Sequence, residues 1–162
     1  SVRIKSDYPT WSSLQGADPD IHYTVNAPRT ARWTVRTHNS RVEVHNLHAA
    51  LSISTHNGQI DVSGFAGALD LDTHNGNAKV QFASLTAPSS VETHNGDVEL
   101  VMPAASRFTL HTSGHNGRVQ SDFAITTRTP GRRGANLDGA VNGGGPSLRL
   151  TSHNGSFHLR KS

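Results

Sequence analysis

The segment Leu51-Ser-Ile-Ser-Thr-His-Asn-Gly-Gln-Ile-Asp-Val62 decides the fold of this chain of 162 residues. Apolar and polar residues alternate on both sides of its central His-Asn-Gly tripeptide, and such alternation is typical of half-buried β-strands. Asn and Gly both accept the backbone conformations of tight turns, so the tripeptide indicates a corner. The segment therefore predicts two strands that meet at a corner.

The tripeptide recurs along the chain, in steps of 18, 18, 20, 21 and 38 residues. Its copies begin at the following histidines, the first copy being a variant that ends in Ser40: His38, His56, His74, His94, His115 and His153. A period in this range is typical of stacked repeats. Half a repeat later a second corner places a large apolar residue between small ones, at Leu47, Phe65 and Leu85. These patterns predict an all-β, single-domain β-solenoid (a β-helix or β-roll) of 18–21-residue coils with Asn-Gly corners.

A different all-β fold accounts for the same pattern. An Asn-Gly pair between alternating strands is also the strongest short signal for a hairpin, so an antiparallel β-meander or sandwich is the alternative. Successive corners would lie about 4.8 Å apart in a solenoid and nearer 10 Å apart in a meander.

The repeats divide the chain into four parts. Residues 1–20 lack a corner motif and are expected to form an irregular cap or edge strand, and residues 21–123 form the coils. Residues 124–146 carry Gly and Pro breakers, which indicate a Gly-rich loop or degenerate coil with a short strand near residues 137–141. Residues 147–162 form the final coil.

Composition limits the class of protein. Only 33% of the residues are hydrophobic and none is cysteine, which fits a thin solenoid core and excludes disulfides and thiolate metal sites. No run approaches the roughly 18 apolar residues of a membrane span. The first residues, 1–7, do not look like a signal peptide, so if the protein is secreted or lies on the cell surface, its signal has been removed. The basic cluster of Arg128, Arg132 and Arg133 lacks interleaved aromatic residues, so nucleic-acid binding is not expected.

Three stretches resemble a known family. They are Ile21-His-Tyr-Thr-Val-Asn-Ala-Pro, the repeated Thr-His-Asn-Gly-x-[Val/Ile]-x-[Val/Leu], and the ending Leu148-Arg-Leu-Thr-Ser-His-Asn-Gly-Ser-Phe-His-Leu. Together they resemble a bacterial family of adhesin-like β-strand repeats, a domain of unknown function, over residues 21–159. The resemblance implies a β-solenoid or β-roll exported to the cell envelope, with no catalytic residues. This chain departs from the family pattern by placing histidine at a position that is more often a small residue such as serine.

The other residues of the motif are expected to build the corner. Continued alternation would point Thr55, Thr73 and Thr93 inward, the histidines outward and the asparagines inward. Stacked asparagines can hydrogen-bond from coil to coil as a ladder, and glycine supplies a positive φ. The predicted corner residues are Asn57, Gly58, Asn75, Gly76, Asn95, Gly96, Asn116, Gly117, Asn154 and Gly155.

The six histidines have three interpretations. Histidine tolerates left-handed geometry, and its rings can stack in an architectural column. Alternatively, a column of imidazoles could bind Zn²⁺, Cu²⁺ or Ni²⁺, although no carboxylate recurs beside it to complete a ligand shell. The third interpretation is recognition of a surface glycan, a polymer or another protein. All three predict sensitivity to pH, because protonation would place like charges side by side.

The sequence does not predict an enzyme. Clustered carboxylates cleave polysaccharides in some β-helix proteins, but the single acids here lie outside any distinctive motif: Asp70, Asp72, Glu92, Asp97 and Glu99. A solenoid also has two open ends, so subunits could stack end to end into a homopolymer. At the C-terminal end we expect the charges of Arg160 and Lys161 to blunt the edge of the final strand. We therefore expect an exported, non-enzymatic structural or adhesive protein without a required cofactor, with a filament subunit and a metal-binding protein as alternatives.

Overall fold

The computed structural model describes residues 28–127 and 136–162 and contains β-strands only. The predicted cap at residues 1–20 and the arginines at 128, 132 and 133 lie outside these residues. No helix capable of crossing a membrane occurs within the described ranges. The strands are β1 (Trp33–Thr37), β2 (Val42–His45), β3 (Leu51–Thr55), β4 (Ile60–Ala66), β5 (Leu69–Thr73), β6 (Ala78–Ser84), β7 (Ser89–Thr93), β8 (Val98–Met102), β9 (Phe108–Gly114), β10 (Val119–Ser121), β11 (Ile125–Thr127), β12 (Asp138–Val141), β13 (Ser147–Ser152) and β14 (Phe157–Lys161).

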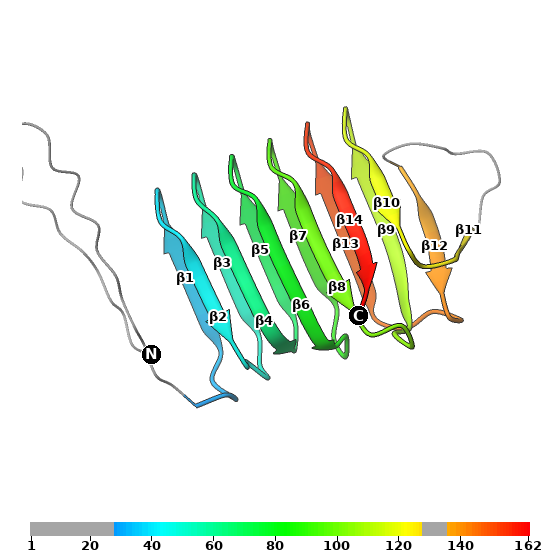
Figure 1. The fold of residues 1–162 in the computed structure, drawn as a ribbon, viewed down its shortest axis with the longest axis horizontal. Helices are drawn as coiled ribbons and strands as arrows, with labels where there is room; N and C mark the ends of the chain where they lie inside the picture. Colours follow the sequence, from blue (N-terminus) through cyan, green and yellow to red (C-terminus); the bar gives the residue numbers. More distant parts are fainter. Residues whose placement is uncertain (1–27, 128–135) are drawn as a thin grey trace, which may run out of the picture.

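The strands form two facing sheets built mainly by parallel pairing (Figure 1). One sheet has eight strands in the order β1-β3-β5-β7-β13-β9-β12-β11, and the other has six in the order β10-β14-β8-β6-β4-β2. Each coil contributes its first strand to the larger sheet and its second strand to the smaller one. For example, β3 pairs in parallel with β5 in the larger sheet, while β4 pairs in parallel with β6 in the smaller. This parallel pairing confirms the β-solenoid and excludes the antiparallel meander.

The core is a narrow layer of alternating side chains between the sheets. In β5, Leu69, Leu71 and Thr73 are buried while Asp70 and Asp72 are exposed. The three predicted apolar residues of the second corner, Leu47, Phe65 and Leu85, are all buried. However, Phe65 lies within β4 rather than in a corner, at a register irregularity where it meets the ring of Phe82 edge to face. The register irregularity between β4 and β6 at this point is a β-bulge.

The last coil of the chain is not the last coil of the stack. Strand β13 lies between β7 and β9, and β14 lies between β8 and β10. The red strands of Figure 1 accordingly stand between two coils that are consecutive in sequence. The expectation that Arg160 and Lys161 blunt a free edge is therefore wrong, because β14 has a parallel partner on each side.

A pair of antiparallel strands lies beyond β9 at the far end of the larger sheet. Strand β12 pairs with β9, and β11 pairs with β12, both in antiparallel orientation. The predicted short strand near residues 137–141 is β12. Phe123, just before β11, is 5% exposed and packs edge to face on Phe108 with ring centroids 5.5 Å apart. Phe123 therefore fills the space between the two sheets at this end.

Candidate functional site

The six histidines of the repeated motif form one continuous column. Adjacent ring centroids are 4.7 Å apart for His38–His56, 4.6 Å for His56–His74 and His74–His94, 4.7 Å for His94–His153 and 5.5 Å for His153–His115. The ring planes are inclined by 24° or less. The order follows the stack rather than the chain, so His153 lies between His94 and His115. All six side chains are exposed.

The asparagines that follow the histidines form a ladder beside this column. Each Asn donates a hydrogen bond from Nδ2 to the Oδ1 of the Asn in the preceding coil, at 2.8–3.0 Å. The ladder runs through Asn116, Asn154, Asn95, Asn75, Asn57 and Asn39. These side chains are exposed or half-buried, so the prediction that they point inward is wrong. The chain bends at the tripeptide, and the strict strand alternation ends there.

The glycines of the motif have a different role from the predicted one. Of these motif glycines, Gly58 alone has a positive φ. Its value of 154° lies in the range that residues with side chains rarely adopt. At every one of these glycines a Cβ would instead overlap the carbonyl oxygen of the corner residue in the preceding coil. At Gly96, for example, the obstructing oxygen belongs to Gly76. Close stacking of the corners, rather than backbone conformation, requires glycine at Gly76, Gly96, Gly117 and Gly155.

The same contact explains why the first copy of the motif ends in serine. The Cβ position of Gly58 faces the carbonyl oxygen of Ser40, whereas no described coil precedes Ser40. A side chain at residue 40 therefore meets no neighbouring corner among the described residues.

Buried hydroxyl groups stabilise the corner from inside the coil. This agrees with the prediction that the threonines of the motif point inward. Thr93 Oγ1 accepts a hydrogen bond from the Gly96 N–H and donates one to the Gly96 carbonyl oxygen, each 3.0 Å long. In the last coil, Ser152 makes the same pair of bonds with Gly155, at 2.7 and 2.6 Å. Each such bracket satisfies both backbone groups of a buried glycine.

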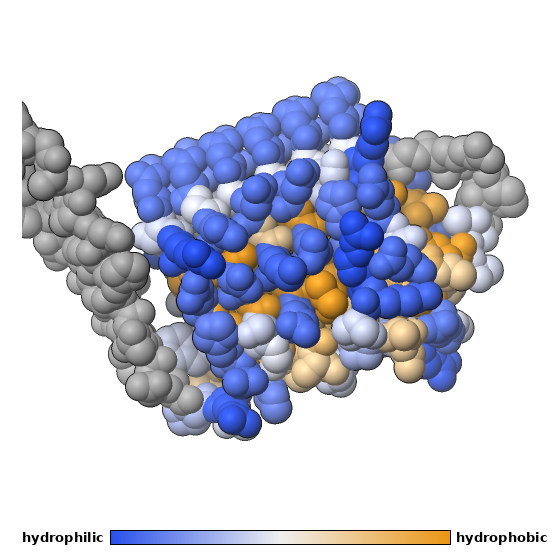
Figure 2. All heavy atoms as spheres, viewed as in Figure 1, coloured by the Kyte–Doolittle hydropathy of each residue, from blue (hydrophilic) through white to orange (hydrophobic). Residues whose placement is uncertain are grey.

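The column, the ladder and the brackets together define a straight polar edge, which we call the His-Asn ridge (His38–Asn39, His56–Asn57, His74–Asn75, His94–Asn95, His153–Asn154 and His115–Asn116). Figure 2 shows it as a continuous hydrophilic band above the sheet face. No hydrogen bond within the described ranges involves any of the six rings, so their nitrogen atoms face solvent. At about 4.8 Å per coil, the ridge is roughly 24 Å long.

The geometry of the column bears on metal binding. The lone pairs of an imidazole lie in the plane of its ring, so nearly parallel rings direct their nitrogens in parallel rather than toward one point. The described residues contain no group of three or more His, Asp or Glu side chains placed to hold a metal ion. In this stacked arrangement, each ring offers a metal ion a single nitrogen ligand.

The acidic residues singled out in the sequence are dispersed over both sheets. Asp70, Asp72 and Glu92 lie on the outer face of the larger sheet, where Asp72 and Glu92 are register neighbours on β5 and β7. Asp97 accepts a hydrogen bond from the Ser156 N–H at 2.9 Å, and Glu99 pairs with Lys79 on the smaller sheet at 2.9 Å. The hydrogen bond to Glu99, followed by the charge of Glu99, raises the pKa of Lys79. Two of these acids are thus engaged in structural contacts.

Sequence reasoning missed an open hollow on the outer face of the larger sheet. It encloses about 520 Å³ and crosses five strands at their first residues. Small outward residues make the hollow, and arginines stand near its two ends: Arg32, Ala50, Ser52, Ala68, Ser90 and Arg149. The signal was present in the sequence as small residues at the two outward positions that flank the first residue of each strand, Ala50 and Ala68 before it and Ser52 and Ser90 after it. Only the strand register aligns these positions.

A stack of parallel two-strand coils with a continuous polar corner ridge places this protein among the β-solenoid repeat domains. The Toastrack DUF4097 family model matches residues 12–160, and the chain belongs to this family, a domain of unknown function with a repeated β-strand fold. The resemblance to a β-strand repeat family is thereby confirmed. Searches of curated proteins and of solved structures gave no match to the chain.

Proposed function

We propose that this protein is an exported, non-enzymatic structural element of the cell surface whose His-Asn ridge is an adhesive surface. The observation that carries the proposal is the ridge itself: the same exposed His-Asn pair recurs on six coils in one straight row. Outward positions near the motif vary freely, as in Arg36, Ser54, Asp72 and Glu92.

The ridge suits the binding of an extended polar partner. Each imidazole is held between neighbouring rings, and each amide of the ladder is fixed by hydrogen bonds, so binding would cost little side-chain ordering. The solvent-facing ring nitrogens offer both donors and acceptors at a regular spacing. A linear glycan lying along the ridge would satisfy these groups repeatedly, and many weak contacts would add up along its length.

End-to-end assembly into a filament is the weaker alternative. Such stacking needs two complementary ends, and at the far end Phe123 and the antiparallel strands β12 and β11 occupy the place of a further coil. Metal binding by the column is also weaker, because the parallel rings do not converge. The filament alternative is a measurable outcome of the tests below.

Binding to immobilised polysaccharides tests the adhesive ridge. The purified protein would be applied to cellulose, chitin, polygalacturonate and hyaluronate, and compared with the variant His56→Ser, His74→Ser, His94→Ser, which removes three central rings but keeps the ladder. We expect retention on at least one polymer and its loss in the variant. A matched control, Asp61→Ser, Lys79→Ser, Gln81→Ser on the outer face of the smaller sheet, should bind as the wild type does.

Three outcomes would count against the proposal. Failure to bind any polymer, or equal binding by the ridge variant, would remove the ridge as the adhesive surface. Release of new reducing ends from a bound polymer would indicate an enzyme. Filaments in electron micrographs of the untreated protein, with a matching void-volume peak in size-exclusion chromatography, would favour the assembly alternative.

A further inference from the structure

We propose that the last coil, residues 147–162, is an exchangeable element that can leave its place in one copy of the chain and occupy the same place in a second copy. The partner is therefore another molecule of this protein, and the interaction surface is the slot between the coil β7–β8 and the coil β9–β10. This inference is independent of the adhesive role of the ridge.

The slot is complementary to the last coil on both of its sides. Leu148 is the register partner of Ser89 on β7 and of Leu110 on β9. Strand β14 pairs along its whole length with β8 and through Phe157–Leu159 with β10. The ladder crosses both boundaries, because Asn154 donates to Asn95 at 2.9 Å and accepts from Asn116 at 3.0 Å. With the coil withdrawn, four strand edges would be unpaired, and unpaired edges bind another chain readily.

The connection that leads into the last coil is short and passes through the left-handed region. Asn142, Gly143 and Gly144 have successive φ values of 49°, 87° and 82°, all in the left-handed region. Residues 142–146 pass over the beginning of β9, where Asn142 Nδ2 donates to the carbonyl oxygens of Ala104 and Ser106 at 3.2 and 2.9 Å. Short hinges under strain favour exchange of the element that follows them, because an extended hinge between two copies releases Asn142 from the left-handed region, which non-glycine residues disfavour.

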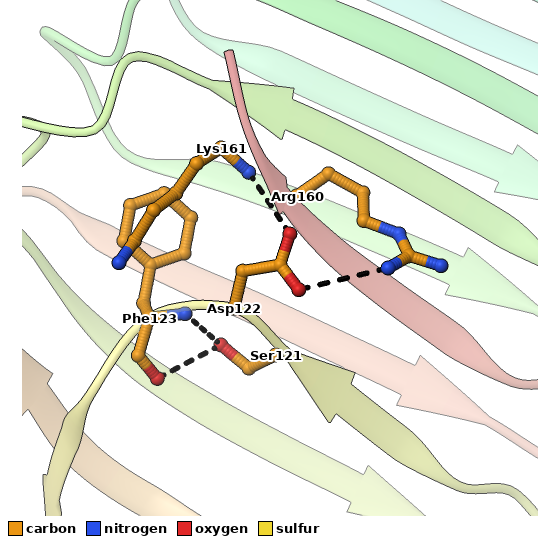
Figure 3. A network of polar contacts seen from close by, with 5 residues as sticks. All are labelled: Ser121, Asp122, Phe123, Arg160 and Lys161. Carbon is orange, nitrogen blue, oxygen red and sulfur yellow. Dashed lines mark hydrogen bonds and ion pairs between the residues drawn. The ribbon is translucent and has the colours of Figure 1, made fainter.

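The far contacts of the coil would form again after exchange. Figure 3 shows the carboxylate of Asp122 between the last two charged residues: it accepts the backbone N–H of Lys161 at 3.4 Å and lies 3.6 Å from the guanidinium of Arg160. The ammonium group of Lys161 lies 5.4 Å from the centroid of Phe123. Every contact except those of the hinge is identical in an exchanged pair.

Two single-cysteine variants of the full chain test this inference. Arg149 and Ser90 are register partners on the outer face of the larger sheet, and the chain has no cysteine of its own. Register partners on neighbouring strands lie within the range of a disulfide. R149C and S90C chains would be mixed at high concentration, partly unfolded in urea, returned to buffer and oxidised. A disulfide between them reports the coil of one copy in the slot of the other.

We expect a several-fold higher yield of R149C–S90C heterodimer than of an R149C–S54C control. Ser54 lies on the same outer face, but on β3, away from β13, so it measures random collision. The heterodimer should increase with protein concentration during mixing. Circular dichroism of each variant alone should match the wild type, because both substituted positions face solvent.

If exchange in the natural chain is slow, a variant of the hinge that favours exchange still allows the proposal to be tested. Gly143→Ala with Gly144→Ala raises the cost of the left-handed hinge without overlapping any backbone atom, so it should increase the heterodimer yield further. Yields equal to the collision control with both the natural and the altered hinge would overturn the proposal. A closed dimer would indicate reciprocal exchange, and a ladder of larger species would indicate exchange in one direction along a chain of copies.

Discussion

Asn154 Nδ2, in the last coil of the chain, donates a hydrogen bond of 2.9 Å to Oδ1 of Asn95, a residue 59 positions earlier. This bond joins the late coil to the early stack and keeps the ladder continuous where the chain order is broken. Every internal asparagine of the ladder accepts one such bond and donates another, whereas Asn39 only accepts.

Removing an internal rung should cost more than removing the terminal one. Asn75→Ala breaks two hydrogen bonds and Asn39→Ala breaks one, and a typical net contribution is about 1 kcal/mol per bond. We expect losses of unfolding free energy of about 2 and about 1 kcal/mol, measured by urea denaturation. Equal unfolding free energies for both variants and the wild type would show that the ladder does not stabilise the fold.

The same substitution at two corners should have different effects. Thr93→Val removes the hydroxyl that satisfies both backbone groups of Gly96, and unsatisfied buried groups cost about 1–3 kcal/mol. Among the described residues the Thr55 hydroxyl makes one long contact, of 3.4 Å to the carbonyl oxygen of Asn57, so Thr55→Val is the matched control. We expect the melting temperature to fall clearly for Thr93→Val and little for Thr55→Val; equal falls would argue against the bracket.

A methyl group should be tolerated at the first corner and rejected at an inner one. In Gly96→Ala the new Cβ overlaps the carbonyl oxygen of Gly76, so we expect a loss of about 3 kcal/mol, at the upper end for overpacking. Ser40→Ala should lie within about 0.5 kcal/mol of the wild type. Chemical denaturation of both variants measures the contrast. A stable Gly96→Ala protein would mean that the corners can move apart.

Phe123 should be essential to the far end of the stack. Its ring is buried against Phe108, so Phe123→Ala is expected to cost about 3 kcal/mol and to expose the amides of β9 and β12 to faster hydrogen exchange. Asp122→Ala removes only exposed contacts of the same turn and should cost less than about 1 kcal/mol. Unchanged exchange in Phe123→Ala would contradict its role as a plug.

The sequence predicts the coils well because their signals are local. Alternating residues such as Leu51, Ile53, Ile60 and Val62 specify strands, and the constant spacing of the corners specifies their stacking. The pattern is weakest in β7, where Ser89 occupies an inward position and its hydroxyl accepts a hydrogen bond from the Leu69 N–H at 3.3 Å. Because a polar residue stands where the alternation requires an apolar one, the hydrophobicity pattern predicts this strand poorly.

The order of the coils could not be predicted in the same way. Every corner carries the same residues, so the sequence does not distinguish His153 stacked beside His94 from His153 stacked beside His115 alone. The 38-residue gap indicates an interruption but not where the chain returns. Similarly, the requirement for glycine at Gly96 arises from a carbonyl group 20 positions away, which only the stacked structure brings near.

The place of the last coil also constrains how the protein is made. Four coils can form in order as the chain leaves the ribosome, but the fifth coil, β9–β10, has no continuous support until residues 147–162 have emerged to fill the space beside it. Completion of the domain therefore waits for the coil of β13 and β14. A nascent chain truncated near residue 142 would lose more than one coil, because β9 and β10 would have no parallel neighbour joining them to the earlier coils.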